Sequence, residues 1–387
     1  MKHSQFSLII ATGFAMFTMF FGAGNIVFPL ALGQIAQDQN FYAILGMLIT
    51  AVGVPFAGLI GMSLFDGDYK SFFNRLGIIP GFITAAAIMG LIGPFGAMPR
   101  CIALSYSTAA TFLPSISLPV FSLICCIAMF LFTFRPNTIL DTLGFYMTPI
   151  LIGSLGIIIV MGFVNVHSEI TTNHDHWDVF LKGLYDGYQT MDLLGAFFFS
   201  SVVVIGLKKD LPKDHTSHKE ILKIALKASV IGALLLGLTY TGFSYVAAYH
   251  SVSLSGISPD VLISQLAIHV LGPYASIIAI IAVAFACLTT ALTLAAVFAE
   301  FIHKDVSFGK IGYIPALIGT LCVTFLVSTL NFNGIAAFLI PILQVSYPAL
   351  IVLTLLNIVY KLYNFKPVKI PVLVVFLISV ILQFVNH

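Results

Sequence analysis

Long apolar runs follow one another along the whole chain and are separated by short segments that are polar or contain Pro and Gly. About 20 consecutive apolar residues suffice for a helix that crosses the hydrocarbon core of a bilayer. The pattern predicts one all-α polytopic membrane domain that covers residues 1–387. Its eleven membrane-spanning helices are expected at 6–33, 41–65, 82–110, 117–134, 138–163, 179–206, 222–249, 271–302, 312–330, 334–360 and 369–386.

The amino-acid composition leaves no room for a sizeable water-soluble domain. Hydrophobic residues make up 59% of the 387 residues and charged residues only 8%, against about 25% charged residues in soluble domains. The net charge of +2 is too small to indicate nucleic-acid binding. The five cysteines lie in apolar runs without metal-ligand or disulfide spacing, which is typical of small buried side chains. We therefore expect the function to lie within the bilayer.

The distribution of Lys and Arg predicts how the chain is oriented. With the N-terminus placed in the cytoplasm, 15 of the 17 basic residues fall in inner loops, and the outer loops carry only Lys182. Cytoplasmic loops of membrane proteins are enriched in Lys and Arg. We therefore expect a multi-pass protein of the cell (plasma or inner) membrane with a cytoplasmic N-terminus, and eleven spans would place the C-terminus outside. Arg100 is left within a span.

A histidine-rich stretch lies in the predicted outer loop before the sixth span. His167, His174 and His176 occur beside Asp175 and Asp178, and an H-x-H pair is able to bind a metal ion. Neither a thiolate nor a pair of histidines at helical i, i+4 spacing accompanies it. A solvated loop is therefore the favoured interpretation, with metal binding as the alternative.

The first predicted span is interrupted near its middle. Gly22, Gly24 and Asn25 lie in the stretch FFGAGNIVFP, and a broken helix survives in a membrane only where it is buried in protein or lines a polar cavity. Carbonyls freed before the break are able to coordinate a cation, and amides at the start of the next half-helix are able to hold a carboxylate. The alternative is that the glycines only form a close helix-packing contact.

The sixth predicted span contains a second interruption, with a polar and glycine-containing entrance. A carboxylate at membrane depth is costly unless it is paired, protonated or faces water. Asp186 is able to lie in solvent at the interface, whereas Asp192 is harder to explain in that way. The two interruptions are five spans apart, which predicts inverted repeats at 6–163 and 179–360 and an additional helix at 369–386. Paired interrupted spans in inverted halves are typical of secondary transporters.

Two adjacent hydroxyl groups lie in the eighth predicted span. Thr289 and Thr290 follow Ala286 by about one helical turn, so that two hydroxyls and one carbonyl oxygen would lie close together. Such hard oxygen ligands suit a cation. Threonine in a membrane helix more often bonds to a preceding carbonyl of its own helix, and that alternative stays open.

The third predicted span carries a charge at the end of its interruption. Two prolines break the stretch GPFGAMPR before Arg100, whose guanidinium is able to pair with Asp192 or Asp186, or to line a permeation route. Tyr106 lies six residues further on and is able to cap a site with its ring and hydroxyl. The alternative for Tyr106 is an aromatic anchor at the membrane interface.

Four stretches in spans one, three, six and eight together resemble the bacterial branched-chain amino acid:cation symporter family, which belongs with the amino acid–polyamine–organocation transporters. They are FFGAGNIVFP, IGPFGAMPR, GYQTMD and ACLTTA. The resemblance covers essentially the whole chain. It implies a leucine-transporter-like fold, a 5+5 inverted repeat with broken helices 1 and 6. The family usually has twelve spans, one more than is predicted here.

The resemblance also implies an activity and a site. The activity would be import of leucine, isoleucine and valine by sodium symport with alternating access, and no cofactor is expected. Sodium would be bound by the carbonyls of Thr18, Phe21 and Ala286 and by the hydroxyls of Thr289 and Thr290. The substrate would lie between the two interruptions, with Tyr106 as a lid, among Gly22, Ala23, Gly24, Asn25, Gln189, Thr190, Met191, Asp192, Leu193 and Leu194.

Two alternatives to sodium symport stay open. Asp192 is a candidate proton carrier, which would make the protein a proton-coupled amino acid symporter with H+ in place of Na+. A receptor or sensor on the same fold would bind amino acids without transport. No HExxH or GxSxG motif and no paired nucleophile and base is visible, which argues against an enzyme. The expected partners are the amino acid and membrane lipid, with no nucleic acid and no obligate protein partner.

Overall fold

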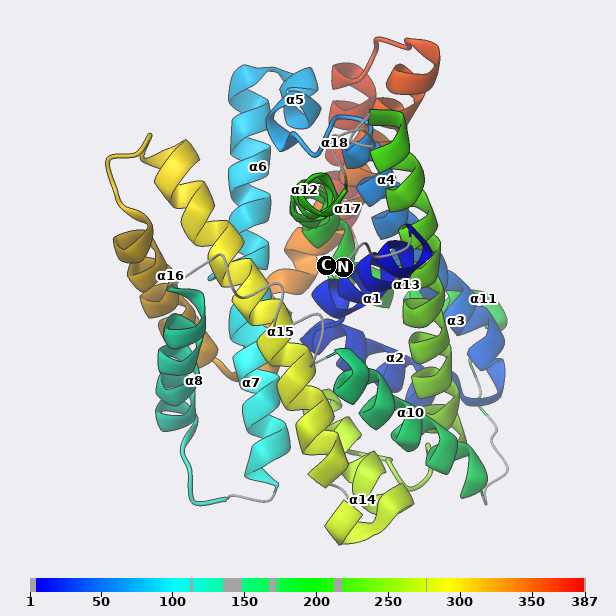
Figure 1. The fold of residues 1–387 in the computed structure, drawn as a ribbon. Coiled ribbons are helices and arrows are strands. Elements are labelled where there is room, and N and C mark those ends of the chain that lie inside the picture. The colour runs from blue at the N-terminus through cyan, green and yellow to red at the C-terminus, as the bar shows by residue number, and fades with distance from the viewer. Residues whose placement is uncertain are drawn as a thin grey trace.

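The computed structural model describes residues 5–111, 114–134, 148–166, 172, 174–211, 218–275 and 277–385. The regular elements within these residues are helices (Figure 1). Their bounds are α1 (Gln5–Phe20), α2 (Ala23–Ala36), α3 (Asn40–Leu48), α4 (Val54–Ser63), α5 (Tyr69–Phe73), α6 (Ile78–Ile92), α7 (Ala97–Ala110), α8 (Leu118–Thr133), α10 (Thr148–Val164), α11 (His176–Gln189), α12 (Asp192–Asp210), α13 (His218–Tyr249), α14 (Leu262–Ala275), α15 (Ile277–Phe301), α16 (Tyr313–Ser328), α17 (Asn331–Tyr363) and α18 (Lys369–Val385).

The helices have the length and composition of a multi-pass membrane protein. Within the described part of the chain, five helical stretches are long and apolar enough to cross a membrane, and the bent pair α11 and α12 makes a sixth. Five further apolar helices of 10–17 residues accompany them. Each of the eleven predicted ranges contains a helix, although residues 138–147 of the fifth range lie outside the described part. The number of spans itself stays a prediction.

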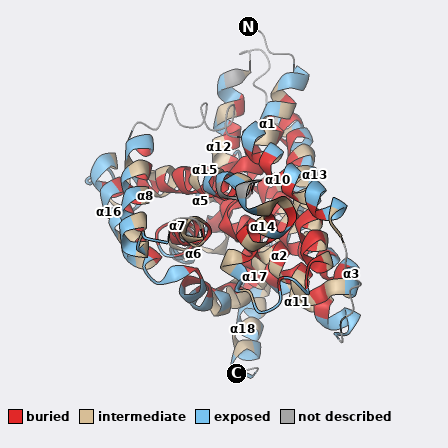
Figure 2. Ribbon diagram, turned by 90° about the horizontal axis from the view of Figure 1, so that it is seen from below, coloured by how far each residue is buried: buried red, intermediate tan, exposed pale blue. Residues whose placement is uncertain are grey.

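Apolar side chains cover the outside of the bundle as well as its centre. Figure 2 shows the buried residues gathered around α1, α12 and α15, with exposed residues on the peripheral helices α8, α16 and α18. Those exposed residues include large apolar side chains such as Leu123, Ile127 and Leu131 on α8, and Leu373 and Ile381 on α18. A contiguous apolar surface of this kind is suited to contact with lipid rather than with water.

The three spans with predicted interruptions are each built from two helices. α1 ends at Phe20 and α2 begins at Ala23, while α11 ends at Gln189 and α12 begins at Asp192 after a bend of 41°. In the third span, residues 93–96 separate α6 from α7. The sequence predicted all three interruptions from glycine, proline and polar residues within apolar runs, and the structure confirms them.

The broken helices lie at the centre of the bundle. α1 and α2 pack against α13, α12 packs against α4, and α15 packs against α7 (Figure 1).

One boundary differs from the prediction, because α14 occupies the start of the range expected for the eighth span. Gly272 has a positive φ of 80° and precedes Pro273, and the helix that runs through the centre begins only at Ile277.

Candidate functional site

The two central helix breaks meet at a small cavity in the middle of the bundle. Its volume is about 30 Å³, which is room for about two water molecules. The lining residues come from both breaks and from the helices α6, α7, α12 and α15 around them. They are Met19, Phe20, Gly22, Ala23, Gly24, Asn25, Ile92, Ala97, Arg100, Cys101, Thr190, Met191, Asp192, Gly195, Phe199, Thr290 and Leu294.

The first break is capped by its own segment. Gly22 has an extended backbone (φ −122°, ψ −159°), which separates α1 from α2, and its amide donates a hydrogen bond to Oδ1 of Asn25 at 2.8 Å. Gly24 lies where the two breaks approach each other closely. A Cβ there would lie 3.0 Å from the carbonyl oxygen of Gln189 and 3.0 Å from Cα of Thr190. Glycine therefore permits the backbone of the first break to touch the backbone of the second.

The second break rests on a residue in the left-handed region. Met191 has φ 63° and ψ 16°, a conformation that costs a residue with a Cβ about 1–2 kcal/mol. This turn frees the carbonyl of Gln189, which accepts a hydrogen bond from Nη1 of Arg100 at 3.0 Å. A side chain of α7 therefore holds the second break, and no glycine marks the left-handed position in the sequence.

A buried network joins the two breaks to α13. Nδ2 of Asn25 donates to both carboxylate oxygens of Asp192, at 2.9 and 2.7 Å, and also to the hydroxyl of Tyr240. The Tyr240 hydroxyl in turn donates to Oδ2 of Asp192 at 2.8 Å. All three side chains are buried. Tyr240 was not predicted from the sequence, because a tyrosine within the apolar seventh span carries no motif or spacing signal.

Arg100 is buried between two aromatic rings. Its Cζ lies 4.9 Å from the ring centroid of Phe28 and 5.2 Å from that of Phe332, and only 2% of the residue is exposed. One guanidinium nitrogen, Nη1, bonds to the Gln189 carbonyl and contacts Sδ of Met191 at 3.5 Å. The other two nitrogens, Nε and Nη2, have no hydrogen-bond partner in the structure.

Of the two possibilities that the sequence left open for Arg100, the structure does not form the ion pair with Asp192 or Asp186. Among the described residues, Arg100 makes no salt bridge, and Asp186 instead pairs with Lys182 at 3.0 Å, one turn earlier on α11. The physical reason is the direction of each group. The Arg100 guanidinium reaches the Gln189 carbonyl before the break, whereas the Asp192 carboxylate turns towards Asn25 after it.

A second cavity lies at the α11 end of the sixth span. Its volume is about 440 Å³, and both charged and apolar side chains line it. Gln189 belongs to this lining, although its backbone carbonyl is bonded to Arg100. The lining residues are Phe28, Asp178, Leu181, Lys182, Tyr185, Asp186, Gln189, Ile340 and Gln344.

Polar contacts tie the opposite end of this span to neighbouring segments. Ser201 on α12 donates to the carbonyl of Gly67, and Tyr69 and Lys70 on α5 both bind Asp305 in the π-helical turn after α15. Burial and the neighbouring Asp305 carboxylate raise the pKa of Tyr69 well above its ordinary value, so its hydroxyl stays protonated and donates to Asp305. These contacts join neighbouring segments at the end of the bundle away from the second cavity.

Spans one and eight touch where the sequence placed the sodium ligands. The hydroxyl of Thr290 donates to the carbonyl of Phe21 at 3.1 Å, and that of Thr289 donates to the carbonyls of Phe285 and Ala286 at 2.9 and 3.0 Å. Thr18 is buried, and its hydroxyl bonds to its own helix at the Phe14 carbonyl, 3.0 Å away. The structure therefore brings oxygen atoms of the two spans together.

Several residues assigned to the substrate do not line the central cavity. Leu193 and Leu194 are fully buried elsewhere, and the Leu193 side chain lies against Gly58 of α4. On α12 the cavity instead receives Asp192, Gly195 and Phe199, at the i, i+3, i+7 spacing of one helix face. The prediction included the consecutive positions Leu193 and Leu194. Because only one face of a helix borders the cavity, these two residues do not line it.

Tyr106 is not a lid in this structure. Its ring packs edge-on against Phe121 of α8, with 5.7 Å between the ring centroids, and it does not line the cavity. Six residues along a helix correspond to a rotation of about 240°. Tyr106 therefore faces a different side of α7 from Arg100, which does line the cavity.

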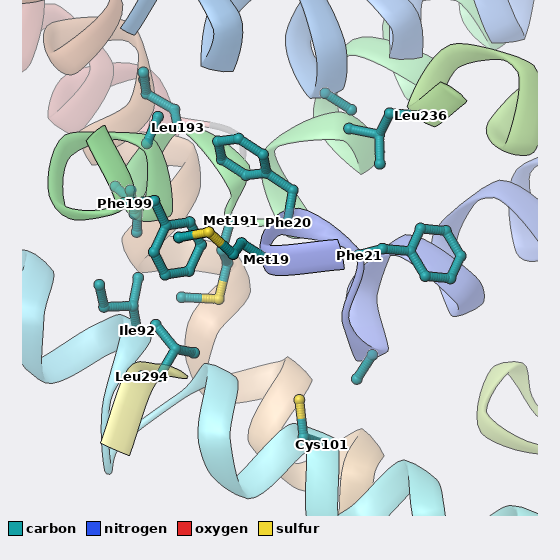
Figure 3. Close-up of a cluster of buried hydrophobic side chains, with 14 of the residues drawn as sticks. Met19, Phe20, Phe21, Ile92, Cys101, Met191, Leu193, Phe199, Leu236 and Leu294 are labelled. Atoms are coloured by element: carbon teal, nitrogen blue, oxygen red, sulfur yellow. The ribbon is translucent and has the colours of Figure 1, made fainter. Parts of the chain in front are cut away.

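The structure reveals an apolar wall that the sequence did not select. Met19, Phe199, Ile92 and Leu294 converge around Met191, as Figure 3 shows. They come from four different helices and share only their spatial position. Together with Phe20 they form the apolar part of the cavity lining, whereas the polar residues of the two breaks form the polar part.

The histidine-rich stretch shows no metal cluster in its described part. Nδ1 of His176 lies 2.9 Å from Oδ1 of Asp175 at the start of α11. No group of three or more His, Cys, Asp or Glu side chains suited to a metal ion occurs among the residues that the structure describes. His167 lies outside the described residues.

Interrupted helices that face each other across a cavity are the way in which secondary transporters build a binding site inside the membrane. This chain has that arrangement, and we conclude that it is a membrane transporter and not an enzyme. It belongs to the family of branched-chain amino acid transport proteins, which matches residues 5–387.

A relative in sequence agrees with this assignment, and solved structures show the fold. The branched-chain amino acid permease BrnQ of Bacillus subtilis (strain 168) is 30% identical over 377 residues, covering 93% of this chain and 83% of the relative. Mhp1, a nucleobase-cation-symport-1 family transporter, has a TM-score of 0.66 at 12% identity over 89% of this chain and 77% of its own. A Na+-coupled sialic acid symporter has a TM-score of 0.56 at 13% identity, over 97% and 88%. The chain therefore has the leucine-transporter-like fold.

Proposed function

We propose that this protein imports leucine, isoleucine and valine across the cell membrane by sodium symport, with its N-terminus in the cytoplasm. The observation that carries the proposal is the two-sided character of the central cavity. Asn25 and Asp192 contribute polar groups to its lining. Met19, Phe199 and Leu294 contribute apolar side chains, which lie together (Figure 3). An aliphatic amino acid has the same two-sided character. The family and the name of the Bacillus subtilis relative support this substrate class.

Binding requires the apolar wall to move, because a cavity of about 30 Å³ is smaller than leucine. Met19 and Met191 are suited to this movement, since methionine is unbranched and adapts its shape at low cost. The larger cavity beside α11 supports a route to the central site from that end. In alternating access the substrate would enter there, and the end near Ser201 and Gly67 would open after binding.

Sodium would bind between spans one and eight. The Phe21 carbonyl and the Thr290 hydroxyl are 3.1 Å apart, and the Ala286 carbonyl and the Thr289 hydroxyl are 3.0 Å apart. Rotation of the two hydroxyl protons away from the carbonyls would free lone pairs on these four oxygens, which together with the Thr18 carbonyl would bind the cation. Moving one positive charge inward across about 100 mV contributes roughly 2.3 kcal/mol, which is about a fiftyfold accumulation.

Proton coupling through Asp192 is a second candidate mechanism. Its carboxylate is buried beside two donors, Asn25 and Tyr240, and lines the cavity. Titratable carboxylates inside membrane proteins are frequent members of proton pathways. The two mechanisms predict different ion requirements and are therefore separable by experiment.

The test is uptake of labelled leucine by proteoliposomes at fixed pH, with sodium replaced by choline. We expect uptake to require sodium, and Thr290→Ala to raise the sodium concentration for half-maximal uptake about tenfold, because one oxygen ligand is lost. Thr293→Ala is the matched control. The Thr293 hydroxyl lies one turn along α15 and bonds within its own helix to the Thr289 carbonyl. The sodium dependence of leucine uptake by Thr293→Ala is therefore expected to match that of the wild type.

Two outcomes would contradict the sodium mechanism. Sodium-independent uptake that follows a pH gradient would transfer the coupling role to Asp192. Unchanged sodium dependence in Thr290→Ala would remove the proposed cation site from span eight.

A further inference from the structure

Arg100 carries hydrogen-bonding capacity that the protein itself does not use. Nη1 bonds to the Gln189 carbonyl, while Nε and Nη2 are buried and without a partner. Leaving donors of a charged group unsatisfied in the interior costs more than leaving a neutral group unsatisfied. No carboxylate of the described residues forms an ion pair with this guanidinium. Its unused donors therefore point to an anion that comes from outside the chain.

The free nitrogens have the arrangement that a carboxylate requires. Nε–H and one Nη2–H form a single edge of the planar guanidinium, and such an edge binds the two oxygens of a carboxylate in parallel. The rings of Phe28 and Phe332, at 4.9 and 5.2 Å, hold the guanidinium in place. Arg100 also lines the central cavity, so a ligand there is within its reach.

The other charged residue of the cavity lining is in a different situation. Asp192 already accepts hydrogen bonds from Asn25 and Tyr240 at 2.7–2.9 Å. Among the residues that the structure describes, no Lys, Arg or His forms a salt bridge with this carboxylate, so the ammonium group of a ligand is able to act as its cationic partner. Arg100 and Asp192 line the same cavity without pairing with each other. A zwitterion is the ligand that satisfies both.

The backbone amide at the first break is a weaker candidate for the carboxylate. Helix N-termini are able to bind anions through free amides, but the Gly22 amide donates to Asn25 at 2.8 Å. The N–H of Gly22 is thus already hydrogen-bonded within the protein, whereas Nε and Nη2 of Arg100 are not.

We propose that Arg100 is the receptor for the α-carboxylate of the substrate, through Nε and Nη2, and that Asp192 receives the ammonium group. This inference rests on the proposed function, because it names the residue that selects amino acids among aliphatic compounds. Arg100 binds the α-carboxylate, which all amino acids share. The apolar wall of Met19, Phe199 and Leu294 contacts the side chain of the substrate.

The experiment measures equilibrium binding of leucine and of leucinamide to purified protein in detergent, at a pH where both amino groups are protonated. Leucinamide keeps the side chain and the ammonium group but lacks the negative charge. We expect the wild type to bind leucine about a hundredfold more tightly than leucinamide, because two charge-assisted hydrogen bonds are lost with the amide. In Arg100→Gln we expect this ratio to fall to within about threefold of unity.

Arg75→Gln is the matched control, because it removes an arginine that lies outside the cavity. Its Nη1 bonds to Asn357 at 2.8 Å and its Nη2 to the Lys366 carbonyl at 2.8 Å. The leucine to leucinamide ratio is expected to stay at its wild-type value in this variant. Arg100→Lys, which keeps the charge but not the two-pronged edge, should give an intermediate ratio.

The outcomes separate this inference from the proposed function. Leucine binding with a wild-type ratio in Arg100→Gln would overturn the role of Arg100 and leave the proposed function standing. Failure of the wild type to bind leucine would overturn both. If Arg100→Gln does not fold, the wild type alone decides, because equal affinity for leucine and leucinamide would also overturn the carboxylate receptor.

Discussion

The two central helix breaks are built in different ways. At the first break, the Gly22 amide is capped by Asn25 from the same segment, three residues further on. At the second break, the left-handed Met191 frees the Gln189 carbonyl, and Arg100 of α7 takes it. The backbone of the first break is therefore capped from within its own segment, whereas that of the second is held by a neighbouring span.

This difference bears on how the site changes during transport. The first break keeps its capping bond when the segment moves, although Asn25 also joins it to Asp192 and Tyr240. The second break changes whenever α7 shifts against α12, because the bond between Arg100 and the Gln189 carbonyl joins the two spans. The same guanidinium faces the cavity, so occupancy of the cavity and the geometry of the second break are linked through one side chain.

The largest effect is expected from Gly24→Ala, because this change forces the two breaks apart. The added Cβ would lie 3.0 Å from the Gln189 carbonyl oxygen and 3.0 Å from Cα of Thr190, and neither backbone atom is able to rotate away. Overpacking of this kind costs about 1–3 kcal/mol. We expect leucine uptake by proteoliposomes to fall by up to about a hundredfold.

Gly206→Ala provides the comparison for that loss. Gly206 lies on α12, and no atom is found within 4 Å of a Cβ added there. Its uptake is expected to match the wild type. Wild-type uptake by Gly24→Ala would show that the contact between the two breaks is not needed for transport, and equal losses in both variants would show that the loss is not specific to that contact.

The next effect is expected from Tyr240→Phe, which removes a hydroxyl that bonds to both half-helices. The change removes the 2.8 Å hydrogen bond from the tyrosine hydroxyl to Asp192, the first residue of α12. A hydrogen bond to a charged group contributes about 1.5–3 kcal/mol. We expect the free energy of unfolding in detergent to fall by about that amount.

Tyr245→Phe, one turn further along α13, is the matched control for Tyr240→Phe. Tyr245 is half-buried, and its ring packs against Tyr249 with 6.4 Å between centroids. Its free energy of unfolding is expected to stay close to the wild-type value. Equal losses of unfolding free energy in Tyr240→Phe and Tyr245→Phe would mean that the hydrogen bond to Asp192 adds no stability of its own.

The comparison also shows what the sequence was able to predict. The first break was predicted in place and in kind, because Gly22 and Gly24 are local signals for an interrupted helix. At the second break, Asp192 stood out as a carboxylate at membrane depth. The left-handed residue there is Met191, and a methionine gives no signal of positive φ.

The rest of the site depends on contacts between distant segments. Arg100 was identified as a buried charge, but its partner is a backbone carbonyl of another span, and backbone atoms leave no trace in a residue pattern. Tyr240 and the apolar wall were missed for a related reason. A chain that is 59% hydrophobic offers too many apolar positions for the sequence to select Met19, Phe199 and Leu294. Packing alone brings them together.

The central claim is that the chain moves a branched-chain amino acid across the membrane with sodium as the coupling ion. The most direct measurement is the internal concentration of labelled leucine in proteoliposomes that hold an inward sodium gradient at equal pH on both sides. The account predicts that leucine accumulates inside above its external concentration and leaves again when the sodium gradient is collapsed. Saturable leucine binding without any accumulation would contradict transport and would identify the protein as a receptor on this fold.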